Sequence, residues 1–367
     1  SSTSADNVPI LIPLDQVSRV KGIMSDAWKA QQATAELLWR GRVRLERGDI
    51  AGAEPFFEEL NPAYKDRVGP TAELAHGGLL LCRLARGAHV LAVEPIIDYC
   101  AALEGANSPP RLLLGLSGRV EGSTDLKGDP SMLTPIDPTY GLCPSLPPIF
   151  VSLSSVRIQA DRLTVMRTGR ANHIAMLYKA AMKGEFESVA ALLGDESPST
   201  DAGVTLVWEL VAARHASDEV RQLARTLLSK RLATTQPAWV HAWCHAGLGR
   251  SLVKETDSDL QMIGVAELAF LPSAYERTVP YLTGIALAES SLAMLRSGND
   301  AAAVSLRERI VERFPSHPIL EWDPIRHWNT ANAMQLLRSM GSESFPAPPP
   351  STIDLPTPVD SEPLKPR

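Results

Sequence analysis

One stretch, residues 37–62, constrains the fold of this chain more than any other: LLWRGRVRLERGDIAGAEPFFEELNP. Apolar residues recur at helical spacing on both sides of Gly48, and Ala53, Phe57 and Leu60 follow that glycine. The pattern predicts two amphipathic helices joined by a glycine turn, with a proline closing the unit. Because such a hairpin cannot bury its outer faces alone, it predicts neighbouring hairpins and hence a stacked helical array.

The same spacing returns twice along the chain. Residues 79–102 have Gly87 at the predicted turn, and residues 282–315 have Gly298 there. Small and large residues follow both glycines at offsets found in the first unit: Ala92, Ile96 and Tyr99 in one, Ala303 and Ile310 in the other. These units predict an all-α fold.

Helical patterns fill residues 21–103 as hairpins and residues 160–341 as further repeats. The second region contains a weaker hairpin, residues 171–193, which turns at Gly184. It ends in a last helix, residues 324–340, which begins with a proline and stops before a glycine. We expect this helix to cap the open end of the array.

Three segments lack the helical pattern. Residues 1–20 are predicted to lie extended on the body, and residues 342–367 to form a disordered, Pro-rich tail with little to bury. Proline and glycine clusters predict an irregular insert at residues 104–159. Within the insert, only residues 112–116 and 149–153 have the apolar content of short strands or buried extended chain. Such a long insert either covers a binding face or is an ordered decoration without activity.

The helical units resemble tetratricopeptide (TPR) repeats, the helix-turn-helix units of α-solenoids. The matching residues are Gly41, Gly48, Ala53, Phe57 and Leu60, then Gly87, Ala92 and Ile96, and finally Ser291, Gly298, Ala303, Ile310 and Pro315. Arg307 departs from the pattern where the family prefers a large apolar residue, and Val189 departs where it prefers a small one. The resemblance implies a helical solenoid with a concave surface that binds a protein or peptide, and it identifies no ligand.

Charge and hydropathy narrow the classes of partner. A net charge of −6 and a pI of about 5.8 argue against a nucleic-acid partner, and we interpret the basic residues within 221–231 as a solvated helix face. No apolar run reaches the ~18–20 residues of a transmembrane segment. Because the chain opens with Ser1, we expect a processed chain, either after signal-peptide removal or with a residual tag. A secreted or periplasmic location and a cytoplasmic one both stay open.

The four cysteines have no CxxC spacing, so they predict neither a zinc site nor a particular disulfide framework. One or two disulfides stay open as alternatives. Cys82 and Cys100 share a predicted hairpin but lie at unequal distances from its turn, which argues against their pairing.

The sharpest local cluster is WVHAWCH at residues 239–245. On a helix, His241 and His245 share one face, and Trp239 and Trp243 lie on nearly the opposite face. Two imidazoles at this spacing suit a metal ion, with Cys244 adjacent. Because the metalloprotease glutamate and a third ligand are missing, we interpret the histidines as structural and keep a metal site as the alternative.

Other polar residues give weaker signals. Asp323 and His327 are four residues apart and predict a salt bridge or a cap in the last helix. Three carboxylates are interpreted as ordinary surface acids: Glu58, Glu59 and Asp98. The sequence has no GxGxxG after a strand, no GxxxxGK[ST] and no GxSxG, so it predicts no catalytic residues and no cofactor.

The sequence therefore predicts a non-catalytic interaction scaffold that binds a protein or peptide on a helical-repeat surface. One alternative is a structural subunit of a larger assembly, held there by its termini and insert. The other is an all-helical enzyme that uses His241 and His245. A binder should show a groove, an assembly subunit large apolar patches, and an enzyme a deep pocket where histidines and acids converge.

Overall fold

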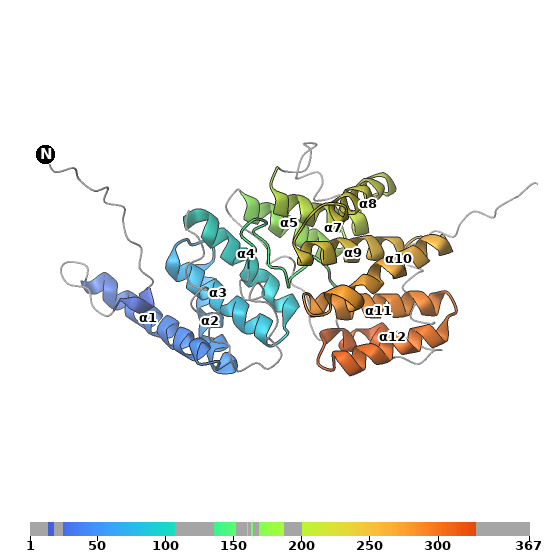
Figure 1. Cartoon of the computed structure of the whole chain (residues 1–367). Helices are drawn as coiled ribbons and strands as arrows, with labels where there is room; N and C mark the ends of the chain where they lie inside the picture. The colour runs from blue at the N-terminus through green and yellow to red at the C-terminus, as the bar shows by residue number, and fades with distance from the viewer. Residues whose placement is uncertain are drawn as a thin grey trace, which may run out of the picture.

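The computed structural model describes residues 14–17, 25–106, 136–151, 160, 163, 169–186 and 200–327. These residues contain helices and no strand. The described residues form twelve α-helices, most of them labelled in Figure 1: α1 (Ser25–Glu46), α2 (Ile50–Tyr64), α3 (Pro70–Ala85), α4 (His89–Ala106), α5 (Arg170–Lys183), α7 (Ala202–His215), α8 (Asp218–Leu232), α9 (Ala238–Leu252), α10 (Ser258–Phe270), α11 (Pro280–Arg296), α12 (Asp300–Arg313) and α13 (Asp323–Arg326). Three short turns complete them: η1 (Leu14–Gln16), η4 (Leu271–Tyr275) and η5 (Pro318–Glu321).

The predicted hairpins and their glycine turns are confirmed. Gly48, Gly87 and Gly298 join α1 to α2, α3 to α4 and α11 to α12, with φ values of 76°, 74° and 79°. Glycine adopts this left-handed backbone region without steric cost. Asp49 then caps α2 by accepting a hydrogen bond of 3.0 Å from the backbone N–H of Gly52, a local device readable from sequence.

Helices that follow one another in the chain pack against each other, and the predicted all-α fold is confirmed at this level. In Figure 1, α1–α4 form one group on the left, and α7–α12 form another on the right. One hydrophobic core runs through both groups, from Leu38 to Ile325.

The small residues of the predicted hairpins lie at close helix contacts. Ala53, Ala92 and Ala303 are all 0% exposed. The Phe57 ring of α2 packs between α1 and α3, so close to Gly78 that a Cβ there would collide with the ring. Three helices are thereby fixed around one aromatic ring.

The two groups of helices meet through three stacked rings. His89 at the start of α4 stacks on Tyr281 of α11, with ring centroids 4.0 Å apart. His317 lies on the same tyrosine at 5.2 Å. In Figure 1 the α3–α4 turn accordingly lies beside the end of α11. Burial lowers the pKa of both histidines to about 4, so these rings stack as neutral imidazoles near pH 7.

Several boundaries differ from the sequence prediction. Helix α2 continues past Pro62 to Tyr64, so this proline removes one i→i−4 hydrogen bond without ending the helix. The described part of the N-terminal segment forms the turn η1 rather than extended chain, and its Asp15 pairs with Arg42 of α1. Residues 149–151 form no strand, and their buried side chains pack against helices instead.

Some predicted features lie outside the described residues: 112–116, 187–193, nearly all of the capping helix 324–340, and the tail 342–367. Of the last helix the structure describes α13, whose Pro324 stands in the first turn. None of the helices in the described part of the chain is both long and apolar enough to cross a membrane.

Candidate functional site

A segment of the insert, residues 136–151, lies among the helices rather than on their surface. Figure 1 shows it in green, running between α4 and α9. Seven of its apolar side chains are buried: Ile136, Tyr140, Leu142, Cys143, Leu146, Ile149 and Val151. We call residues 136–151 the inner segment.

Side chains from three helices hold the backbone of the inner segment. Trp243 of α9 donates its Nε1–H to the Pro144 carbonyl at 3.0 Å, and Arg250 donates to the Phe150 carbonyl at 3.3 Å. Two further contacts come from other helices: Tyr178 of α5 to the Leu146 carbonyl and Cys100 of α4 to the Gly141 carbonyl. Main-chain carbonyls are groups that any extended peptide offers, so the helices hold this segment as a peptide is held in a groove.

The start of the inner segment is shaped by Asp137. Its carboxylate accepts the N–H groups of Thr139 and Tyr140 at 2.9 and 3.1 Å, and the indole N–H of Trp239 at 3.1 Å. Trp239 also packs edge-on against Tyr140, with ring centroids 5.1 Å apart. The tryptophan face of α9 therefore contacts the insert, a partner that the sequence did not indicate.

The histidine face of α9 points elsewhere, and the two imidazoles have different partners. The Nε2 atom of His241 lies 3.0 Å from the Thr234 carbonyl. The Nδ1 atom of His245 lies 2.7 Å from Glu267 of α10, and its ring stacks on Phe270 at 4.3 Å. Among the described residues, no group of three or more His, Cys, Asp and Glu side chains is placed to hold a metal ion.

All four cysteines are buried and free. Burial raises the pKa of Cys82 and Cys244 to about 12 and that of Cys143 to about 11, and it also raises that of Cys100. Because the thiolate is the reactive form, these thiols are apolar core residues near neutral pH.

Asp98 is not a surface acid, and the prediction was wrong. Its side chain is 5% exposed on α4, and burial raises its pKa to about 7. The error arose because Asn61, in α2 of the preceding hairpin, hydrogen-bonds Asp98 on a side that a lone hairpin would leave open. By contrast, Glu58 and Glu59 are exposed, and Glu58 pairs with Arg83 at 3.2 Å.

Asp98 belongs to a buried polar chain. Asn61 hydrogen-bonds Asp98, and its Oδ1 atom lies 2.6 Å from Nδ1 of His76, whose Nε2 atom lies 3.1 Å from the Tyr64 carbonyl. The carbonyl requires the proton on Nε2, so neutral His76 presents an acceptor at Nδ1. Turning the Asn61 amide over lets it donate to His76 and accept from protonated Asp98, and an amide orientation is assigned from such networks. Each of these hydrogen bonds then joins a donor to an acceptor, in keeping with the pKa of His76, which burial lowers to about 4, although Asp98 Oδ2 is buried without a partner.

The basic residues within 221–231 are not a uniformly solvated face, which corrects a second prediction. Arg231 pairs with Glu209 of α7, at 3.0 Å from Nη2 to Oε1, and Arg225 donates to Ser251 Oγ at 2.8 Å. The side chains of these two arginines are 18% and 12% exposed. They link α8 to α7, the first helix of its own hairpin, and to α9, the first helix of the next one. A single helix pattern does not reveal these contacts.

Three more cations lie where α7, α9 and α11 end. Arg214 donates to the Arg250 carbonyl, Lys254 to the Arg214 carbonyl at 3.1 Å, and Arg296 to the Val253 carbonyl at 3.3 Å. Burial, followed by the charges of Arg214 and its neighbours, lowers the pKa of Lys254 to about 8. Helix C-terminal carbonyls carry partial negative charge and lack intrahelical donors, so these cations cap helix ends.

Asp323 and His327 are joined through the backbone of α13, where the His327 N–H donates to the Asp323 carbonyl at 3.1 Å. Among the described residues, no ion pair joins their side chains, so these two residues are linked through the backbone of α13.

The surface that the sequence missed lies on α10. Met262, Ile263 and Phe270 are 48%, 50% and 47% exposed, and within this helix only Gly264 and Leu268 are buried. The signal was present, since α10 carries apolar residues on all sides. A helix with that pattern is covered on more than one face, by its own chain or by a partner.

We compared the chain with protein-family models, with curated proteins and with solved structures, and none of the three comparisons gave a match. The fold and the surface of the chain are therefore the basis for a functional proposal.

Proposed function

We propose that the protein is a non-catalytic interaction scaffold, similar to TPR arrays, that holds a protein partner on the outer surface of its C-terminal hairpins. One observation carries the proposal. The inner segment occupies the space among the helices, while α8, α10 and α12 each bury only two residues and leave their other faces open.

The location of the partner follows from the energetics of the inner segment. A peptide that displaced this segment would have to expose its seven buried apolar side chains. Each such side chain contributes about 1.5–3 kcal/mol when fully buried. The binding surface of the sequence-based proposal, a concave inner face, is thus replaced by an outer one.

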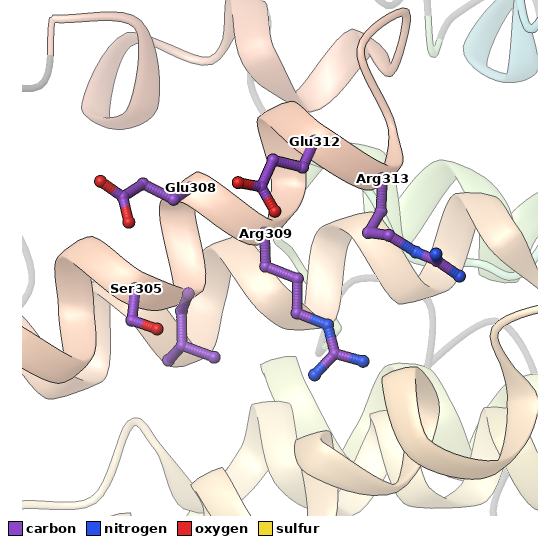
Figure 2. Close-up of a pocket in the computed structure, with 6 residues that line it drawn as sticks. Ser305, Glu308, Arg309, Glu312 and Arg313 are labelled. Carbon is purple, nitrogen blue, oxygen red and sulfur yellow. The ribbon is translucent and has the colours of Figure 1, made fainter.

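The alternatives receive different support. A structural subunit of a larger assembly would use the same exposed apolar residues, and it differs from a scaffold in having a permanent partner. An enzyme that uses His241 and His245 would need a pocket that includes them. The hollow described here, about 600 Å³ in volume, is lined by residues of α12 alone (Figure 2).

Selection of displayed peptides on the full chain tests the proposal. We expect enriched peptides that bind with micromolar or tighter affinity and that lose binding when the chain is heat-unfolded. An assembly subunit would instead purify with a fixed stoichiometric partner. Selection without enrichment over the unfolded control would contradict the scaffold.

A further inference from the structure

Three cations from three hairpins gather where α7, α9 and α11 end. Lys254 donates to the Arg214 carbonyl of α7 at 3.1 Å, and Arg214 donates to the Arg250 carbonyl of α9. Arg296 of α11 donates to the Val253 carbonyl, also at the end of α9, at 3.3 Å. Because these bonds all meet at the end of α9, the three charged groups lie close together. We call Arg214, Lys254 and Arg296 the cation cluster.

Carboxylates do not neutralise the cation cluster. Among the described residues, none of its three side chains forms an ion pair, and each is held by a backbone carbonyl instead. Asp257, in the turn after α9, caps α10 by accepting the N–H groups of Asp259 and Leu260. The other acids of this region pair with other arginines: Arg250–Glu289, Arg221–Asp218 and Arg225–Glu255.

The helix ends compensate only part of the charge. The C-terminus of a helix carries about half a negative charge, so three of them leave a surplus of about 1.5 positive charges on the cation cluster. The outer helices α8, α10 and α12 begin beside these ends. Acids in their first turns offset the positive partial charges of their own N-termini.

The titration of the neighbouring groups agrees with a local positive surplus. Burial, followed by the charges of Arg214 and other arginines, lowers the pKa of Lys254 to about 8. Burial lowers the pKa of Arg214 to about 10, and the charges of Arg250 and Arg296 lower it further. His215 is affected in the same way, since burial and then nearby cations lower its pKa to about 3. An anion bound here would relieve this repulsion.

The cation cluster also retains donors that a ligand can reach. An arginine side chain has five N–H donors and a lysine has three, and each member of the cluster uses one on a carbonyl. Lys254 and Arg296 are exposed. Arg214 has no side-chain nitrogen that is both sealed from solvent and without a partner, so its remaining donors reach the surface.

We propose that the cation cluster binds a phosphate monoester. Such a group carries about −1.5 to −2 charges near pH 7 and three acceptor oxygens, which match the surplus charge and the free donors. The two arginines offer paired N–H groups to two phosphate oxygens, and Lys254 adds a point charge. A carboxylate brings one charge and two oxygens, so it satisfies fewer of these donors. The group belongs to a phosphorylated side chain of a protein or to a small phosphate compound. This inference goes beyond the scaffold function and does not depend on it.

Phenyl phosphate and phenyl sulfate test the charge requirement on the full chain. The two ligands have similar shapes, but phenyl sulfate carries a single negative charge. In calorimetric titrations at pH 7, phenyl phosphate should bind with a millimolar or tighter dissociation constant, and phenyl sulfate at least about tenfold more weakly. The affinity for phenyl phosphate should fall as sodium chloride is added. Equal binding of the two ligands, or no binding of phenyl phosphate, would overturn the proposal.

Substitutions locate the phosphate on the cation cluster. Lys254→Gln combined with Arg296→Gln should abolish binding of phenyl phosphate, whereas Lys254→Arg, which retains the charge, should preserve most of it. Arg313→Gln is the matched control, because Arg313 is 59% exposed and lies at the opposite end of α12. Should the paired variant melt much lower than the unaltered chain, Lys254→Gln alone should still weaken binding by about tenfold. Equal loss in the Arg313→Gln variant would assign the binding to unspecific charge and overturn the site.

A degenerate peptide library distinguishes the two sources of phosphate. One version has phosphoserine at its centre, and the other has serine there. Retention of the phosphoserine version alone, lost in the Lys254→Gln variant, would support a phosphorylated protein as the ligand. Binding of phenyl phosphate with no retention of either version would support a small phosphate compound at the same site. If display-selected peptides bind but phenyl phosphate does not, the scaffold function holds and this inference is overturned.

Discussion

The second helix of each hairpin is buried to a different extent in the two groups of helices. In the N-terminal group α2 buries six residues, and α4 is buried on most sides, including at Asp98. In the C-terminal group α8, α10 and α12 bury two residues each, while α11, the hairpin partner of α12, buries fifteen. The same hairpin pattern thus yields an inner helix in one region and an outermost helix in the other.

If the proposed scaffold function holds, this difference separates the residues that stabilise the fold from those that bind a partner. In the N-terminal group α4 packs on nearly all sides, whereas α2 keeps an exposed face that includes Glu58 and Glu59. In the C-terminal group most buried residues belong to α7, α9 and α11. Each of the outer helices α8, α10 and α12 retains one exposed face. Apolar residues on those free faces contribute little to folding and are available for binding.

Acidification should disrupt the stacked rings of His89, Tyr281 and His317 between the two groups of helices. It has the largest expected effect on the free energy of unfolding. The folded pKa of His89 and of His317 is about 4, below the ordinary value of 6.5. Unfolded chains therefore bind protons that the folded chain excludes, and stability is lost as the pH falls from about 6.5 to about 4. Each histidine should thereby lower the free energy of unfolding by on the order of 3 kcal/mol. Urea unfolding at a series of pH values measures this loss. His89→Phe should keep the ring contact and flatten this dependence, and an unchanged slope would contradict the assignment.

Breaking the buried ion pair of the C-terminal group should have the next largest effect on the free energy of unfolding. Arg250 and Glu289 are 6% and 5% exposed, and Arg250 Nε lies 2.8 Å from both carboxylate oxygens. Arg250→Met leaves a buried carboxylate without its partner and should lower the free energy of unfolding by about 3–5 kcal/mol. Adding Glu289→Leu should recover most of that loss. A double variant as unstable as the single one would show that Arg250 acts mainly through the inner segment.

Asp98→Asn tests the buried chain in the N-terminal group. The folded pKa of Asp98, about 7, lies above the ordinary value of 3.8. As the pH rises through that interval the unfolded state loses its proton first, so Asp98 destabilises the chain progressively and reaches its full effect above pH 7. The asparagine variant should match the unaltered chain near pH 4 and exceed its stability by up to about 4 kcal/mol near pH 8. Parallel stability curves would mean that Asp98 is ionised in the folded state at low pH.

Glycine substitutions compare the packing of the two groups directly. Gly78→Ala forces a methyl group against the rigid Phe57 ring and should cost about 1–3 kcal/mol. Gly247→Ala meets Leu210 and Leu228, whose side chains adjust by rotamer changes, so we expect a smaller loss in thermal melts. Combining Gly78→Ala with Phe57→Leu should relieve part of the clash. Equal losses of stability in the Gly78→Ala and Gly247→Ala variants would contradict this difference in packing between the two groups.

The smallest effect is expected on the free face. Ile263→Asp should change the free energy of unfolding by less than about 0.5 kcal/mol, because its side chain is 50% exposed. Ile97→Asp in α4, at a position 2% exposed, should prevent folding. Comparable destabilisation by the two substitutions would show that α10 is part of the core.

The hairpins were predictable from sequence because their signals are local. Gly48, Gly87 and Gly298 need a left-handed backbone, and Asp49 needs only the N–H of Gly52 to cap its helix. The opposite faces of Trp239 and His241 on α9 follow from helix periodicity alone. The sequence shows that Met262, Ile263 and Phe270 of α10 are apolar, but it does not show that they are exposed.

Exposure and burial were decided by contacts between distant parts of the chain. Asp137 meets Trp239 across 102 positions, and Arg250 meets Phe150 across 100. Such pairings depend on how the hairpins stack, so no pattern in the sequence indicates that the insert fills the inside or that Asp98 is covered. The sequence by itself determined where helices begin and turn, because those choices lie within a few residues. Tertiary structure alone decided which helix faces are free, because burial depends on what lies opposite.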